Sequence, residues 1–94
     1  MFQIQVGAQG AVKFLGRLDA SAAEQAHATL RALAGPMTAD FSELEYISSA
    51  GLGLMIETHK RLASQGHGLR IINTTPRVRN IFAYAGLDKL LRVE

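Results

Sequence analysis

The sequence contains no cysteine, which excludes disulfide bonds, thiolate metal sites and cysteine-based catalysis. It also lacks an apolar run long enough to cross a bilayer, so we expect no membrane insertion. The N-terminal segment MFQIQVGAQG alternates polar and apolar residues and has no basic start, which is not the pattern of a signal peptide. By elimination, these absences predict an intracellular, cytoplasmic protein.

The chain also lacks a large excess of charge of either sign. Ten Lys and Arg stand against eight Asp and Glu, which gives a formal net charge of +2 at pH 7. The positive residues are scattered apart from the pair Arg77 and Arg79, so we expect no nucleic-acid partner. What remains is an ordinary globular composition, with 48% hydrophobic and 19% charged residues. Because 94 residues leave no room for a second core, we predict one domain over residues 1–94.

Several short segments have the pattern of β-strands. Apolar residues alternate with polar ones in residues 2–6, and a second apolar segment spans residues 11–18. The turn GAQG lies between them, which predicts a hairpin. Later strands are predicted at residues 37–41, 68–74 and 90–93, and the segment SELEY at 42–46 is expected to be a loop.

A helical period replaces the alternation after residue 18. Ser21 and Glu24 fit a capping box at the start of this first helix, and Asp19 just before them is another candidate cap. Gly35 and Pro36 form a stop signal. The apolar residues that would share one helical face are Ala22, Ala26, Leu30 and Leu33.

A second helix is predicted to begin near Ser48 or Ser49 and to end at residues 65–66. Leu54 lies opposite the predicted inner face and is expected to be exposed. That inner face is predicted to contain Leu52, Met55, Ile56, His59, Leu62 and Ala63.

A third helix is predicted to begin with Thr75 as N-cap and Pro76 at its first position. The order strand-strand-helix-strand-helix-strand-helix-strand indicates an α/β fold: a mixed, largely parallel sheet of four to five strands with helices packed against it. Right-handed crossovers would put the start of each helix at the carboxyl edge of the strands, where functional residues tend to gather. We expect Asp19, Ser48 and Ser49 at this edge.

Two adjacent serines stand at the start of the second helix, in the stretch ISSAGLGLM. One of them is explained as an N-cap, which contributes about 1 kcal/mol. Phosphorylation would explain the other, because it adds about −1.5 to −2 charges and the N–H groups of a helix start favour an anion. A partner surface shaped for a neutral hydroxyl would then no longer fit, while the fold of this chain would persist. Beside such a site, Leu54 is either a partner contact or an ordinary surface residue.

Other chemistry has weak support. The segment AGLGLM has two glycines but neither the third glycine of a dinucleotide fingerprint nor the Lys-Ser/Thr of a phosphate loop. Tyr46 and Ile47 stand where a serine-hydrolase elbow needs glycine. Asp40 and Glu45 are interpreted as loop or capping carboxylates. The three histidines, His27, His59 and His67, show no metal-binding spacing. We therefore expect no catalysis, no metal and no cofactor.

The run DFSELEYISSAGLGLM, residues 40–55, resembles the signature of the STAS family, the sulfate-transporter and anti-sigma-factor-antagonist domains. Residues 16–25 and 68–94 resemble the flanking segments of that family, so the resemblance covers nearly the whole chain. The stand-alone bacterial anti-sigma factor antagonists are the most similar branch. The resemblance implies a non-catalytic protein that binds an anti-sigma factor serine kinase when unphosphorylated. The kinase ejects it by phosphorylating it, and a metal-dependent serine phosphatase restores it.

The resemblance also implies roles for single residues. The phosphoacceptor would occupy one of the two positions before Gly-Leu-Gly, and Ala50, the nearer one, cannot accept phosphate. Ser49 is therefore the expected acceptor, and Ser48, where many members carry aspartate, is the second choice. Asp19 matches an acidic position beside the phosphosite. The implied partner-binding residues are Asp19, Ser48, Gly51, Leu52 and Leu54.

Two other interpretations stay open. Some STAS proteins are small cytoplasmic subunits of lipid or solute ABC transporters, and they use the same surface to bind the ATPase. In that case the two serines would be ordinary helix caps. An enzyme is the more distant alternative, and ATP turnover by the purified domain would be its sign.

Overall fold

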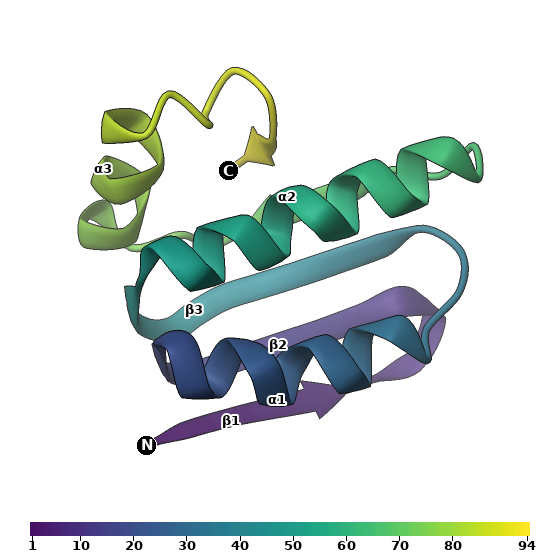
Figure 1. Ribbon diagram of the computed structural model, residues 1–94, viewed down its shortest axis with the longest axis horizontal. Helices are drawn as coiled ribbons and strands as arrows, with labels where there is room; N and C mark the ends of the chain where they lie inside the picture. Colours follow the sequence, from purple (N-terminus) through teal and green to yellow (C-terminus); the bar gives the residue numbers. More distant parts are fainter.

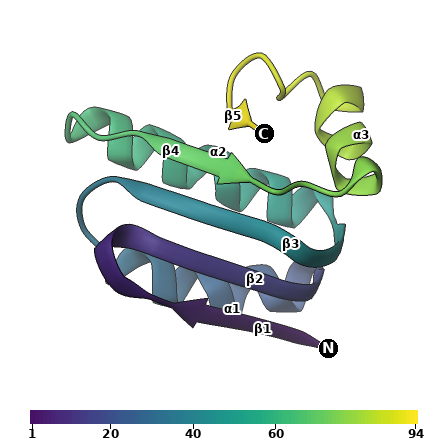
Figure 2. The same cartoon turned by 180° about the vertical axis from the view of Figure 1, so that it is seen from behind.

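Figures 1 and 2 show the computed structural model of residues 1–94, in which one five-stranded sheet has helices α1 and α2 along the same face. The strands are β1 (Phe2–Val6), β2 (Ala11–Leu18), β3 (Met37–Ile47), β4 (Leu69–Ile72) and β5 (Arg92–Val93). The helices are α1 (Ala20–Arg31), α2 (Ser49–Ser64) and α3 (Pro76–Tyr84), with a single 3-10 turn at Ala8–Gly10. None of these helices is long and apolar enough to cross a membrane.

The strands lie in the sheet in their sequence order, β1-β2-β3-β4-β5. Strands β1 and β2 form the predicted antiparallel hairpin, whereas β2, β3, β4 and β5 are mutually parallel. This confirms the predicted mixed, largely parallel sheet. Each parallel crossover returns through a helix, so the starts of α1, α2 and α3 all follow carboxyl ends of strands.

Strand β3 is longer than the sequence predicts, and the loop expected at residues 42–46 is wrong. The strand continues to Ile47 because it pairs with β2 along its whole length. Two register shifts each insert one extra residue into β3, so Phe41, Leu44 and Ile47 are buried at a spacing of three rather than two. A search for strict alternation of apolar and polar residues therefore misses the second half of β3.

Side-chain caps define the three helix starts. The predicted capping box of Ser21 and Glu24 is wrong, because Asp19 caps α1 by accepting a hydrogen bond from the N–H of Ala22 at 3.0 Å. The predicted Thr75 cap of α3 is confirmed, and its hydroxyl accepts from the N–H of Val78 at 3.3 Å. Strands β4 and β5 are shorter than predicted.

The hydrophobic core lies between the sheet and its helices. Three phenylalanines run through it: the ring centroids of Phe14 and Phe41 are 5.2 Å apart, and those of Phe41 and Phe82 are 6.3 Å apart. Because Phe82 comes from α3, this contact ties the last helix to the central strand. The opposite face of the sheet carries polar side chains instead, including a Lys13–Glu43 ion pair of 2.6 Å.

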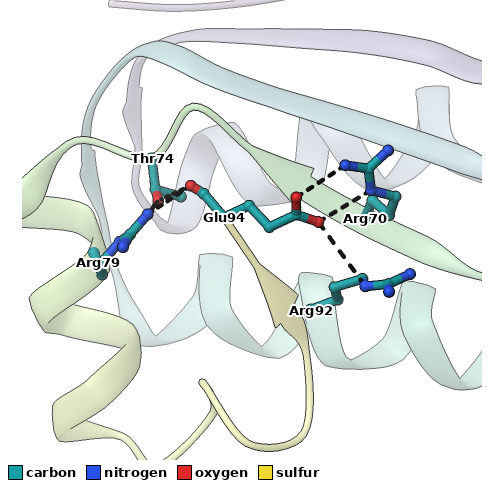
Figure 3. A network of polar contacts seen from close by, with 5 residues as sticks. All are labelled: Arg70, Thr74, Arg79, Arg92 and Glu94. Carbon is teal, nitrogen blue, oxygen red and sulfur yellow. Dashed lines mark hydrogen bonds and ion pairs between the residues drawn. The ribbon is translucent and has the colours of Figure 1, made fainter.

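Glu94 connects β5 to β4 and α3 (Figure 3). Its carboxylate accepts two hydrogen bonds from Arg70, at 3.0 and 2.9 Å. Its main-chain oxygen accepts from Arg79 at 2.6 Å and from the hydroxyl of Thr74 at 3.1 Å. A fifth hydrogen bond, from the N–H of Glu94 to Ile71 O at 2.7 Å, extends the β4–β5 pairing. We call this set of contacts the Glu94 clasp.

Candidate functional site

The ends of β2 and β3 bring Asp19 and Ser48 together, as predicted. Leu18 and Ile47 are paired at the carboxyl edge of the sheet, and the next residue in each strand caps a helix. The carbonyl oxygen of Leu18 accepts two hydrogen bonds from Ser48, one from its N–H at 2.9 Å and one from its hydroxyl at 3.2 Å. The starts of α1 and α2 are therefore joined through one carbonyl group.

The Ser48 hydroxyl both donates and accepts a hydrogen bond within the protein. Ser48 is the N-cap of α2, and its oxygen accepts from the N–H of Gly51 at 3.3 Å while its proton goes to Leu18. The side chain is half-buried. A phosphate on this oxygen would have to break the cap, so Ser48 is a poor acceptor in this conformation.

Ser49 has the opposite environment. It is the first residue of α2, its side chain is exposed, and its hydroxyl makes no hydrogen bond within the protein. The first intrahelical bond runs from the N–H of Leu52 to Ser48 O at 2.9 Å, and Ser48 caps Gly51. The N–H groups of Ser49 and Ala50 are therefore left for solvent or an anion. This geometry suits a hydroxyl that gains and loses a phosphate.

Gly51 lets the start of α2 lie close to the two strand ends. It is buried, and a Cβ at this position would lie 2.7 Å from Ile47 Cγ1 and 2.8 Å from Leu18 O. Any larger residue would push the helix away from the sheet. The burial of Gly51 leaves it little surface to offer a partner.

The prediction that Leu54 is exposed is wrong. Its exposed fraction is 6%, and it lies beside Ala23 and His27 of α1. The error arises because α2 is covered on two sides, by the sheet and by α1, whereas the sequence pattern was interpreted with a single inner face. Leu52 is half-buried against the core. The residues that α2 actually buries are Gly51, Leu54, Met55, Thr58 and Leu62.

The other candidate polar residues are not gathered at this edge. Asp40 lies within β3 and accepts hydrogen bonds from the N–H of Ser42 at 2.9 Å and from Asn73 at 3.3 Å. Burial raises the pKa of Asp40, but these hydrogen bonds outweigh it and the pKa lies below the ordinary value. His59 is half-buried, and its Nδ1 has no hydrogen-bond partner. No group of three or more His, Asp or Glu side chains is arranged to hold a metal ion.

Sequence reasoning missed a groove between α1 and α2 that opens next to Ala50. Its volume is about 410 Å³. At its rim, His27 Nε2 and Glu57 Oε1 are 2.6 Å apart, which bridges the two helices. The signal in the sequence was a glycine inside a helix, at position 53. The groove is lined by Ala23, Glu24, His27, Ala50, Gly53, Leu54 and Glu57.

Comparison with protein families gives a match over residues 2–92 to the family model described as "Mlab, STAS domain". The match spans all five strands and all three helices except the last residue of β5.

Solved structures of similar fold include anti-sigma factor antagonists. The Bacillus cell fate determinant SpoIIAA in its phosphorylated form has a TM-score of 0.72 and 23% identity, with 100% of this chain and 91% of that chain covered. Unphosphorylated SpoIIAA has a TM-score of 0.70 and 23% identity, with 89% of this chain and 83% of that chain covered. A Thermotoga maritima protein assigned as an anti-sigma factor antagonist gives 0.80 and 17% identity, with coverages of 98% and 84%. At these identities the likeness is one of fold.

Proposed function

This chain belongs to the STAS domain family, and we propose that it is an anti-sigma factor antagonist that changes partners when Ser49 is phosphorylated. One observation carries the proposal: of two adjacent serines at a helix start, Ser48 is used as the cap and Ser49 is left exposed and unbonded. Unphosphorylated, the protein binds an anti-sigma factor that is also a serine kinase. A metal-dependent serine phosphatase reverses the modification.

The similar fold of SpoIIAA, solved in both its phosphorylated and unphosphorylated forms, supports this proposal. The fold alone does not assign a function. The added support comes from this chain's own residues, because the helix start supplies two free N–H groups beside the Ser49 hydroxyl.

The chemistry is a phosphoryl transfer in which this chain is the substrate. The Ser49 oxygen attacks the γ-phosphorus of ATP held by the kinase, ADP leaves, and the hydroxyl proton passes to a base of the kinase. The product carries about −1.5 to −2 charges at neutral pH. The Ser49 and Ala50 N–H groups and the helix dipole stabilise that charge, so the fold persists. A bound partner would have to desolvate the new anion, which favours release.

The experiment is incubation with the cognate kinase and ATP, followed by mass-spectrometric mapping. We expect one phosphate, on Ser49, and none on the Ser49→Ala variant. The Ser48→Ala variant is the matched control and should still be phosphorylated. Ser49→Asp should weaken kinase binding without unfolding the protein. Phosphate on Ser48 alone, or an aspartate variant that binds as tightly as the parent, would contradict the proposal.

A second candidate function is a small cytoplasmic STAS subunit of a lipid or solute ABC transporter that binds the ATPase. The observation that favours it is that the matching family model is described only as "Mlab, STAS domain" and names no anti-sigma factor. In this case the two serines act only as part of the helix start. Co-purification with a transporter ATPase, with no phosphate on the chain and no effect of Ser49→Asp on the complex, would decide for this function.

A further inference from the structure

The groove between α1 and α2 contains a glycine that the fold does not require. Gly53 lies inside a helix and is exposed, and a Cβ added there would meet nothing within 4 Å. Its φ is not positive, so no backbone strain calls for glycine. Glycine at such a position costs roughly 1 kcal/mol relative to alanine. Positions that break a local rule without a structural reason are where functional demands are expected.

Gly53 leaves the floor of the groove open. The lining between the charged residues is apolar: Ala23 lies on the α1 side, and Leu54 lies on the α2 side with the small residues Ala50 and Gly53. A side chain at residue 53 would project from the α2 wall into this space. The missing side chain therefore admits another group.

The rim of the groove is negatively charged. Glu24 comes from α1 and Glu57 from α2, and no lysine or arginine lines the groove. His27 donates through Nε2 to Glu57 Oε1, which holds that carboxylate at the rim. An apolar floor under a negative rim is complementary to a long aliphatic side chain with a positive end.

We propose that the groove receives an arginine or lysine side chain of the partner kinase, with its stem on Ala50 and Gly53 and its charge beside Glu24 and Glu57. This inference rests on the proposed function, because it concerns the contact that holds the unphosphorylated protein to that kinase.

The groove also stands at a fixed place relative to the phosphoacceptor. Ser49, Gly53 and Glu57 are spaced by four residues, so they follow one ridge of α2. At 1.5 Å per residue, Gly53 lies about 6 Å along the helix axis from Ser49. A kinase side chain anchored in the groove thus sets the distance between the kinase and the Ser49 hydroxyl. The anchor positions the acceptor and takes no part in the phosphoryl transfer.

The first test is the Gly53→Leu variant, which fills the groove from a site where a side chain has room. We expect a melting temperature equal to or above that of the parent, because leucine favours the helix over glycine. We expect the affinity for the kinase, measured by calorimetry without ATP, to fall roughly tenfold or more. If Gly53→Leu binds the kinase less tightly and is at least as stable as the parent, misfolding does not explain the loss of binding.

The second test removes charge. Glu24→Gln should weaken kinase binding and reduce its dependence on salt, because a charge pair with the partner is lost. Asp88→Asn is the control, because it also neutralises an exposed acidic residue but lies outside the groove. It should leave the affinity for the kinase and its salt dependence unchanged.

The outcomes separate this inference from the function on which it rests. If the parent binds the kinase and is phosphorylated on Ser49, but Gly53→Leu and Glu24→Gln bind within about twofold of the parent, the groove proposal is overturned and the function stands. If the parent neither binds the kinase nor accepts phosphate, the function fails and the inference fails with it.

Discussion

Two glycines near the start of α2 illustrate how the same residue type answers different demands. At Gly51 an added Cβ would lie 2.7 Å from Ile47 Cγ1 and 2.8 Å from Leu18 O, and Leu18 O already accepts two hydrogen bonds. At Gly53 the same atom would have free space around it. The first glycine is needed for packing, and the second is not.

We expect Gly51→Ala to destabilise the protein by about 1–3 kcal/mol, because the helix start must move away from the strand ends. Gly53→Ala should stabilise it by up to about 1 kcal/mol through helix propensity. Urea unfolding of both variants measures the difference. Equal effects of the two substitutions would refute the assignment of Gly51 to packing.

The two serines are predicted to separate stability from phosphorylation. Ser48→Ala should cost about 1 kcal/mol, because the cap of Gly51 and the hydrogen bond to Leu18 O are lost. Ser49→Ala should change stability by less than about 0.5 kcal/mol, because its hydroxyl is exposed and unbonded. Thermal unfolding of the two variants checks this. A larger loss for Ser49→Ala than for Ser48→Ala would contradict the hydrogen bonding described here.

At the scale of elements, the weakest attachment is that of β5. It has two residues and lies at the edge of the sheet, so its position depends on the Glu94 clasp (Figure 3). Hydrogen bonds from Arg70 lower the pKa of Glu94 below its ordinary value. Because the folded protein holds this carboxylate ionised, the clasp stabilises the fold above the ordinary glutamate pKa of about 4.3. The contribution is lost as the pH falls through the lower, folded-state value.

The predicted outcome for Glu94→Gln is therefore dependent on pH. The variant should be less stable than the parent at pH 7, because Arg70 loses an ionic partner. The difference should shrink as the pH falls through the folded-state pKa of Glu94, which lies below the ordinary glutamate value. Urea midpoints of both proteins across this range give the comparison. A gap that stays constant with pH would mean that the ionised clasp does not contribute.

Elements could be predicted from the sequence where one local signal decides them. The Thr75–Pro76 start of α3 is such a case, since a cap and a fixed φ act within a few residues. The second half of β3 was missed because its bulges follow from pairing with β2, a partner distant in sequence. Leu54 was misplaced because its burial depends on the packing of α1 beside α2, which no local sequence pattern reveals.

The same limit applies to the candidate site. Local pattern and family resemblance were enough to single out Ser48 and Ser49 and to place them with Asp19 at the carboxyl edge. Their different hydrogen bonding could not be predicted, because it depends on the Leu18 carbonyl oxygen thirty residues before Ser48. The groove as a whole could not be predicted either, since its two walls are separate helices and Gly53 was its only signal in the sequence.

At the scale of the whole molecule, the small net charge conceals an uneven distribution. Seven of the ten Lys and Arg residues lie in residues 60–94, whereas six of the eight Asp and Glu residues lie in residues 1–59. The helix α1 and the first half of α2, which form the groove, belong to the acidic part. A global count of charge therefore could not indicate where a basic partner would bind.

Hydrogen exchange should follow the position of each strand in the sheet. We expect the slowest exchange in β3, whose Ala39 is fully buried and is paired with Val12 of β2 and Ile71 of β4. The fastest strand should be β5, at the edge and held by surface contacts. Hydrogen–deuterium exchange followed by mass spectrometry of peptides from both strands measures the two rates. Glu94→Gln serves as a control that should accelerate exchange near residues 92–94 and leave β3 unchanged. Similar rates in β3 and β5 would contradict the expected gradient.

The agreement between strand order and chain order matters during synthesis. As the nascent chain leaves the ribosome, each new strand finds its neighbour already made, so the sheet can grow from one edge to the other. Once α2 has emerged, Ser49 and both walls of the groove are present, but β4 and the Phe82 that covers Phe41 are not. The newly made apolar side of β3 is then open to other chains. We therefore expect aggregation during synthesis to be favoured until residue 82 has left the ribosome.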